Sequence, residues 1–245
     1  MSLILVHNLL ASLDTSLVEP DIGTRYFKYD FNDSGNYTLV SGNYDSIDST
    51  GSNTLTLNAG SSTQRPEQVD WPAKSGLKCA QFVSSSNELM YGATSIGSSG
   101  WTTLSYYLVL QSTGQSNNEY AMTMPFNNGG TNGLDIQEDG SQFKSGFRNG
   151  TPNPIKYTRS STAQVIWIYH SGTAGQLYND TGSGSTLQDS NSSSIFDYTG
   201  MSLGSFYNFS SFCWSGYIGE FVLIQNPGTQ ADAELYADYL ASKWL

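Results

Sequence analysis

The sequence predicts an all-β protein in which two antiparallel sheets pack into a sandwich, with one short helix at the C-terminal end. Apolar and aromatic residues alternate with polar ones in many short segments, as expected of half-buried strands. Only 13% of the 245 residues are charged, and Gly, Ser, Thr and Asn are abundant. Such a composition suits the surfaces and turns of β-sandwiches better than those of helical proteins.

The C-terminal segment has the most specific pattern. Residues 216–224 form a β-branched and aromatic run that predicts one buried, central strand. Asn226-Pro227-Gly228 is a turn signal, and Thr229 and Asp232 have the spacing of a capping box. We therefore expect a helix near residues 230–244. Its apolar stripe comprises Leu235, Tyr236, Tyr239, Leu240 and Trp244.

The remaining strands are expected in short alternating runs separated by turn residues. No repeat of fixed period is present. The strongest strand patterns are residues 101–111 and 163–170. The others are 26–31, 54–57, 76–83, 120–124, 133–137, 142–148, 176–178 and 202–206.

Three groups of residues, in their order, resemble the laminin-G-like, or concanavalin A-like, jelly-roll family. Residues 62–66, 76–82 and 87–90 are similar to the family's Arg-Pro, Leu-x-Phe-Asp-Gly and Asp-Tyr-Leu series, with Val83-Ser84 in place of Asp-Gly. Residues 164–180 resemble a strand pair whose second member reads Leu-Tyr-Val-Asn-Gly. Residues 216–245 resemble the closing strand and terminal helix.

This resemblance covers residues 25–245 and implies a jelly-roll domain. Variants of the family with the terminal helix resemble modules of phage structural proteins and bacterial surface proteins. Residues 1–24 precede the domain and are interpreted as an arm that packs on the domain or on a partner. The apolar segment has no Lys or Arg before it, and His7 and Asn8 interrupt it, which disfavours a signal peptide. One helical face of the arm holds Leu3, Val6, Leu10, Leu13 and Leu17.

The charge excludes two classes of partner. A formal net charge of −11 with ten Lys and Arg residues leaves no basic patch for nucleic acid and disfavours anionic lipid. No apolar run approaches the ~20 residues that span a bilayer.

No arrangement typical of catalysis is found. Glycosidases that resemble this fold carry Glu-x-Asp-x-x-Glu on one strand, and no such string occurs here. The cluster at residues 135–140 is interpreted as a solvated hairpin. Glu220, expected on one strand face with Ile218, Val222 and Ile224, is interpreted as a structural hydrogen-bonding residue. His7 and His170 lack a nucleophile elbow, and His170 is expected at an exposed loop edge.

The resemblance also implies a possible Ca²⁺ site between loops. Asp45 and Asp48 with Asn43 form one candidate ligand set, and Glu88 with Asn87 another. Ordinary Asx turns are the alternative. Cys79 and Cys213 are expected to be buried free thiols, although a disulfide between them stays open.

Aromatic residues beside turns are candidates for sugar binding, because a pyranose ring stacks on an exposed aromatic face. Each is otherwise a core residue. The candidates are Trp71, Tyr91, Trp101, Tyr207 and Trp214.

We therefore expect a non-enzymatic virion structural protein, such as a phage decoration, fibre or knob protein, with a host-surface glycan as its candidate ligand. The arm would contact other virion proteins or copies of the chain. The initial Met and the absence of a convincing signal peptide or wall anchor favour this hypothesis. The alternative is a secreted carbohydrate-binding module or lectin. A glycan-cleaving enzyme requires carboxylates from different loops to converge.

Overall fold

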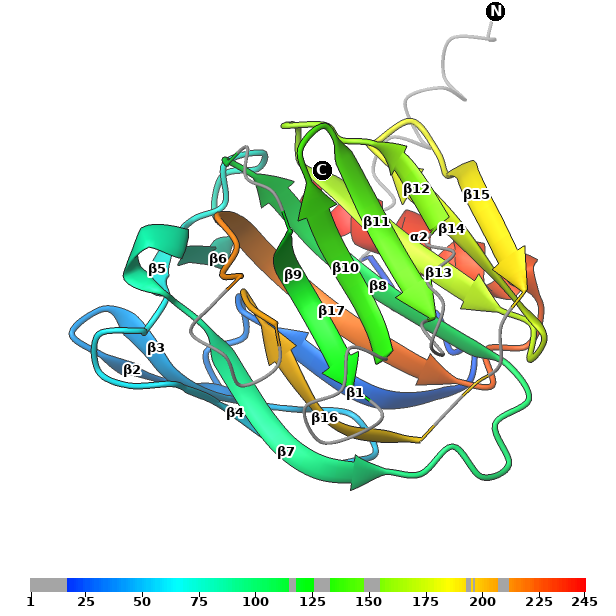
Figure 1. Cartoon of the computed structure of the whole chain (residues 1–245), viewed down its shortest axis with the longest axis horizontal. Coiled ribbons are helices and arrows are strands. Elements are labelled where there is room, and N and C mark those ends of the chain that lie inside the picture. Colours follow the sequence, from blue (N-terminus) through cyan, green and yellow to red (C-terminus); the bar gives the residue numbers. More distant parts are fainter. Residues whose placement is uncertain are drawn as a thin grey trace, which may run out of the picture.

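The computed structural model describes residues 17–114, 118–125, 133–147, 155–192, 195, 197–206 and 212–245. Most of the predicted arm, including Leu3, Val6, Leu10 and Leu13, and the candidate Tyr207 lie outside these residues. Within the described part, strands dominate, and one α-helix of fifteen residues lies at the C-terminal end (Figure 1). No helix in the described part is long and apolar enough to cross a membrane.

The elements follow the chain in this order: β1 (Thr24–Asp30), β2 (Tyr37–Val40), β3 (Asn43–Asp48), β4 (Thr56–Ala59), β5 (Glu67–Asp70), β6 (Lys78–Phe82), a 3₁₀ turn (Ser84–Ser86), β7 (Met90–Ile96), β8 (Leu104–Ser112), β9 (Glu119–Pro125), β10 (Gly133–Asp139), β11 (Gln142–Phe147), β12 (Ile155–Thr158), β13 (Gln164–His170), β14 (Ala174–Asp180), β15 (Thr186–Ser192), β16 (Tyr198–Leu203), β17 (Gly216–Gln225) and α2 (Gln230–Trp244).

All the named strands belong to one hydrogen-bonded sheet, and the pairs between them are antiparallel. From one edge the pairing runs β12–β11–β10–β9–β16–β7–β4–β3, and β2 also pairs with β3. It continues through β5 and β6 to β17, β8, β13, β14 and β15, while β1 also pairs with β17. The expected division into two separate sheets is therefore not confirmed.

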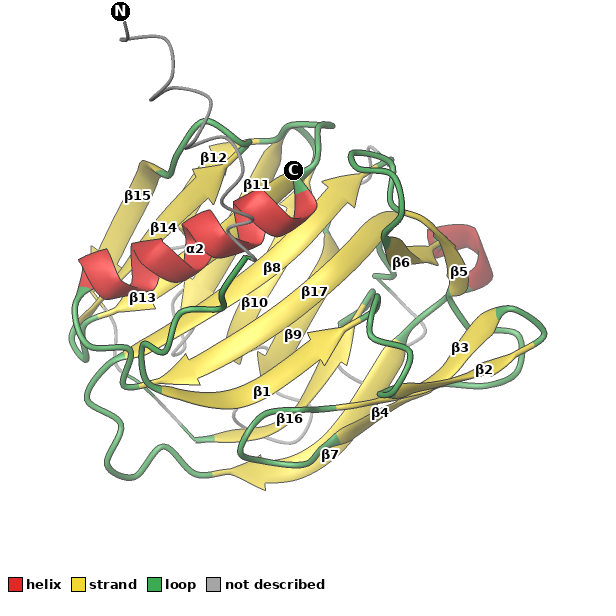
Figure 2. Ribbon diagram, turned by 180° about the vertical axis from the view of Figure 1, so that it is seen from behind, coloured by secondary structure: helices red, strands yellow, loops and turns green. Residues whose placement is uncertain are grey.

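The single sheet folds over into two layers. In Figure 1, β9, β10 and β11 cross in front of β8, β13 and β17. Figure 2, which is seen from behind, shows α2 covering the opposite face of β8, β13 and β17. We call β12, β11, β10, β9, β16, β7, β4, β3 and β2 the front layer. The back layer comprises β6, β1, β17, β8, β13, β14 and β15.

Two apolar clusters hold these layers together. The main core lies between front and back, where Met122, Leu134 and Ile136 meet Leu108 and Phe221 from the opposite layer. The second core lies between the back layer and α2. Its members include Tyr107, Trp167, Val222, Tyr236, Leu240 and Trp244.

The start of α2 confirms the predicted capping box. The N–H of Thr229 donates to the Asp232 carboxylate at 2.8 Å, and the N–H of Asp232 donates to the Thr229 hydroxyl at 3.2 Å. The predicted apolar stripe is only partly right, because Leu235 is 55% exposed and Tyr239 is half-buried. Ala233 and Ala237 take inward positions, where small side chains let the helix approach the sheet.

A β-bulge in β17 corrects the expected grouping around Glu220. The register with β8 shifts between Ile218 and Glu220, so Ile218 points into the main core while Glu220 points toward α2 with Val222. Gly219 occupies the bulge, and a Cβ there would lie 2.7 Å from the ring of Trp244. The bulge therefore makes room for this indole.

Candidate functional site

A row of polar residues crosses the outward side of the front layer. Its members are direct partners on neighbouring strands, from β10 through β9, β16, β7, β4 and β3 to β2. We call it the polar row. In this order it comprises Asp135, Thr123, Ser202, Tyr91, Asn58, Ser46 and Thr38.

The sequence places these side chains outward because core residues flank them along each strand. Thr123 lies between Met122 and Met124, and both methionines belong to the main core. The same apolar–polar–apolar order surrounds Asp135 and Ser202. Since successive side chains of a strand point to opposite faces, each middle residue points away from the core.

The row has a covered half and an open half. At the covered end, Asp135, Thr123 and Ser202 are at most 4% exposed. The hydroxyls of Thr123 and Ser202 lie 2.8 Å apart, and that of Ser202 donates to the carbonyl of Ser205 at 2.7 Å. This end is therefore engaged within the protein.

The open half consists of Tyr91, Asn58, Ser46 and Thr38. Asn58 and Thr38 are exposed, while Tyr91 and Ser46 are half-buried. The next outward pair beside Tyr91 is Gly200 opposite Ala93. Of these two residues, Ala93 is exposed and Gly200 is buried. Tyr91 makes no contact with another aromatic ring among the described residues.

The other predicted aromatic residues do not join this site. Trp71 and Trp214 are core residues, and their Nε1 groups donate to the Trp244 carbonyl at 2.7 Å and to Glu138 at 2.8 Å. Trp101 is also buried, edge-on to Tyr26. These three indoles occupy the core position that was the alternative for each candidate, and they offer no open face for stacking. Tyr91 is thus the described candidate that lies on the polar row.

The predicted calcium ligands are not brought together. Asp45 is ion-paired with Arg65 at 2.5 Å, and Asp48 accepts a hydrogen bond from the Thr56 hydroxyl. Glu88 accepts from the N–H of Val83 at 2.8 Å, and burial raises its pKa to about 7. No group of three or more His, Cys, Asp or Glu residues in the described ranges could hold a metal ion. The three candidate carboxylates are therefore each engaged by a protein group.

Glu220 belongs to a chain of alternating charges between α2 and the sheet. Its Oε2 accepts from Lys243 at 2.6 Å and from the Trp244 indole at 2.9 Å. Lys243 also binds Asp30 at 2.5 Å, and Lys28 lies 3.5 Å from the Glu220 Oε1. Burial and the neighbouring Asp30 raise the pKa of Glu220 against these cations. Its full burial and its partners give it the structural role expected from the sequence.

The acidic segment 135–140 is not a solvated hairpin. Glu138 is fully buried on the core side of β10, where its Oε1 lies 2.6 Å from the Arg159 Nε. Its Oε2 accepts from the Ser112 hydroxyl at 2.6 Å. Asp135 on the outward side is 4% exposed. The prediction of a solvated hairpin was wrong because a cluster of charged residues does not reveal whether both faces of its strand are buried.

His170 is also buried rather than exposed at a loop edge. Its Nδ1 accepts a hydrogen bond from the N–H of Gly172 at 2.9 Å, and burial lowers its pKa to about 4. Cys79 and Cys213 are buried free thiols, as expected.

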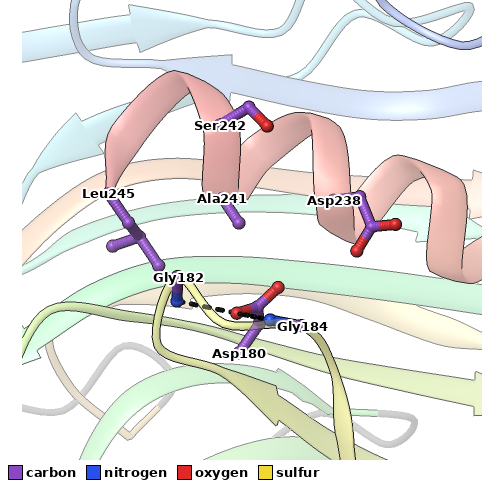
Figure 3. A pocket seen from close by; sticks show the side chains of 7 residues that line it. All are labelled: Asp180, Gly182, Gly184, Asp238, Ala241, Ser242 and Leu245. Atoms are coloured by element: carbon purple, nitrogen blue, oxygen red, sulfur yellow. Dashed lines mark hydrogen bonds between the residues drawn. The ribbon is translucent and has the colours of Figure 1, made fainter.

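A hollow of about 430 Å³ lies on the α2 side of the molecule (Figure 3). The turn after β14 and the end of α2 line it, and Asp180 and Asp238 face it. The Oδ1 of Asp180 accepts from the N–H groups of Gly182 and Gly184 at 2.7 and 3.2 Å. This carboxylate therefore shapes the turn, and the hollow lacks an aromatic wall.

The fold is shared with solved structures of very low sequence identity. No protein-family model and no curated protein matches the sequence. The binding domain of botulinum neurotoxin serotype G is similar with a TM-score of 0.58 and 10% identity, over 89% of this chain and 51% of that chain. A GH54 α-L-arabinofuranosidase soaked with a cyclic sulfate inhibitor has a TM-score of 0.61 and 9% identity, over 91% and 60%.

A third similar structure is the botulinum neurotoxin DC binding domain in complex with rat synaptotagmin II, with a TM-score of 0.61 and 8% identity, over 91% of this chain and 52% of that chain. The chain spans only about half to three-fifths of the length of these proteins. The likeness supports an all-β fold of the β-sandwich type for this chain. It shows a fold, which many unrelated functions share.

Proposed function

We propose that this chain is a non-catalytic glycan-binding module whose ligand lies on the open half of the polar row. The observation that carries the proposal is the half-exposed Tyr91 in line with three neutral, hydrogen-bonding side chains. Sugar sites combine an aromatic face with a few convergent polar groups. The amide of Asn58 and the hydroxyls of Ser46 and Thr38 supply both donors and acceptors.

The open half suits an elongated ligand. Tyr91 and Thr38 are three strand spacings apart, which is about 14 Å. Two structures that are similar over part of their length contain such ligands: a neurotoxin binding domain in complex with SialylT and an arabinofuranosidase mutant soaked with 4-nitrophenyl α-L-arabinofuranoside. These ligands belong to those proteins and support only the class of ligand proposed here.

Binding without cleavage is proposed because the outward carboxylates of β10 are badly spaced for hydrolysis and those of β3 are engaged, Asp45 by Arg65 and Asp48 by the Thr56 hydroxyl. Asp135 and Asp139 lie four residues apart on β10, about 13 Å, whereas glycosidases hold their two carboxyl groups about 5–10 Å apart. Asp139 is moreover paired with Lys144. The protein should release no reducing ends from a polysaccharide panel, and turnover lost in Asp135→Asn would overturn the non-catalytic part of the proposal.

The described root of the arm, residues 17–24, contacts the side of the molecule opposite the polar row. Glu19, near the root of the arm, binds Lys28 at 2.9 Å and accepts a hydrogen bond from the Tyr236 hydroxyl of α2. The helix lies outside the back layer, and the row lies outside the front layer (Figures 1 and 2). A partner held by the arm would thus leave the row free.

This arrangement supports the virion structural role, a phage decoration, fibre or knob protein, as the setting of the module. The alternative setting is a secreted carbohydrate-binding module or lectin. Mass spectrometry of purified particles distinguishes them: the proposed role requires the protein in the particles, and its recovery only from culture supernatant would favour the secreted form.

Glycan-array screening followed by calorimetry tests the binding site. Tyr91→Ala should weaken binding of any glycan hit at least tenfold, a loss of about 1.4 kcal/mol, while Tyr91→Phe keeps the ring and most of the affinity. Tyr239→Ala, on α2, is the matched control and should leave affinity unchanged. If Tyr91→Ala binds as well as the native protein while its fold is intact, the proposed site is wrong.

A further inference from the structure

We infer that the open half of the polar row selects uncharged glycans and rejects acidic ones. This inference rests on the proposed function, because it names the class of sugar that the same site takes. It is carried by the distribution of charged side chains around Tyr91, Asn58, Ser46 and Thr38.

The open half contains no cation. Its four members are neutral, and the next outward pair along β3 and β4 is Asp48 opposite Thr56. Asp48 is exposed and accepts from the Thr56 hydroxyl, and no cation is paired with it in the described structure. Asp45, which precedes Ser46, is neutralised by its ion pair with Arg65. Among the described residues beside the open half, the charge without an ion-pair partner is therefore the negative one of Asp48.

Cations elsewhere are held by carboxylates. Arg65 is bound at 2.5 Å to Asp45, the residue before Ser46. Among the described lysines and arginines, only Lys74 and Lys156 form no ion pair with a described residue, and Lys74 donates to the Ser242 carbonyl at 2.6 Å. The paired ones are Arg25, Lys28, Arg65, Lys78, Lys144, Arg159 and Lys243.

Lys144 and Lys156 share the outward face with the row but lie far from its open half. They are direct partners on β11 and β12, four and five strands from β7. These separations are about 19 and 24 Å, whereas the Debye length in physiological salt is about 8 Å. Neither lysine can therefore neutralise a carboxylate or sulfate bound beside Tyr91.

An acidic sugar at this position would meet Asp48 and the field of a protein whose net charge is −11. A neutral sugar can instead offer hydroxyl donors to the Asp48 carboxylate and to the Asn58 carbonyl, and hydrogen bonds to an ionised acceptor are the stronger ones. The same carboxylate thus favours a polyhydroxyl ligand and opposes an anionic one.

The test is an array of neutral oligosaccharides, each with its sialylated or sulfated counterpart, followed by calorimetry of any pair that binds. The acidic member should bind about fivefold or more weakly, the factor that one close charge contact produces at a water-like dielectric. The acidic member should bind Asp48→Asn more tightly than the native protein, and this difference should grow as the salt concentration is lowered. The affinity of the neutral member should differ between the two proteins by no more than about twofold.

A gain of function sharpens the test. Thr38→Lys places a cation at the end of the open half and should raise acidic binding about fivefold, whereas Thr186→Lys, at an exposed threonine of β15, is the matched control and should not. If acidic glycans bind the native protein as tightly as their neutral counterparts, the inference is wrong while the proposed function stands. Loss of that acidic binding in Arg65→Gln would show that Arg65 is the cation responsible. Absence of binding to either set overturns the proposed function and this inference with it.

Discussion

The indole Nε1 of Trp244 donates a hydrogen bond to the Oε2 of Glu220 at 2.9 Å, so the last turn of α2 is joined to the central strand β17. The contact requires the bulge at Gly219, since a Cβ there would lie 2.7 Å from the Trp244 ring. A carboxylate with no solvent exposure thereby gains a neutral donor besides its two lysines. The pair shows that α2 is an integral layer of the fold.

Gly219→Ala should therefore lower the free energy of unfolding by about 1–3 kcal/mol through overpacking. Trp244→Ala should lower it by about 3–5 kcal/mol, and deletion of residues 230–245 should prevent soluble folding. Leu235→Ala on the same helix, at an exposed position, should change it by less than about 0.5 kcal/mol. Chemical denaturation measures all of these, and a Gly219→Ala protein of native stability would contradict the packing argument.

Local signals predicted the elements at the C-terminal end well. Thr229 and Asp232 predict the start of the helix from a segment of four residues, because a capping box involves only neighbouring backbone groups. Strands with large residues on both faces, such as β8 and β13, were also predicted. By contrast, six strands were missed, because they are short or interrupted by Gly and polar residues and so resemble loops until a neighbouring strand pairs with them. They are β2, β3, β5, β7, β12 and β15.

The candidate site was less predictable because it depends on register between distant segments. Asn58, Tyr91 and Ser202 become neighbours only when β4, β7 and β16 pair. The usable local signal was a polar residue between two core positions, as in Met122-Thr123-Met124. Likewise, nothing local distinguishes the buried Trp214 from an exposed platform, since its burial comes from packing beside Glu138.

The buried pair of Arg159 and Glu138 should be far more important than an exposed pair. Arg159→Ala leaves the Glu138 carboxylate buried without its cation and should cost about 3–5 kcal/mol. Lys78→Ala removes an exposed partner of Asp70 and should cost less than about 1 kcal/mol. Equal losses in urea denaturation would show that Arg159 does not neutralise Glu138.

His170 should make the protein less stable as the pH falls from about 6.5 to about 4. Burial lowers its pKa to about 4 from the ordinary value of 6.5, so the unfolded chain binds more protons in this window. Its contribution is fully present above pH 6.5 and is lost on acidification. Glu88 acts oppositely, because burial raises its pKa to about 7. The measurement is therefore the difference between native and His170→Asn denaturation curves across this range, and a constant difference would contradict the expectation.

Two truncations separate the arm's proposed attachment role from its contribution to folding. Removal of residues 1–16 leaves Glu19 bound to Arg25, Lys28 and Tyr236, so the domain should keep its stability while losing any oligomer or particle attachment. Removal of residues 1–23 also strips these partners, and we expect a folded protein that is less stable by about 1–3 kcal/mol.

Light scattering and thermal unfolding of both truncated proteins, with Glu19→Gln as the point-variant control, make the comparison. Glu19→Gln keeps the arm but removes its charge, so it should share the loss of stability and not the loss of assembly. A full-length protein that is strictly monomeric and fails to attach would contradict the attachment role. Unfolding of the protein that lacks only residues 1–16 would show instead that the arm completes the core. The attachment role therefore requires that residues 1–16 determine assembly, while Glu19 in residues 17–23 determines stability.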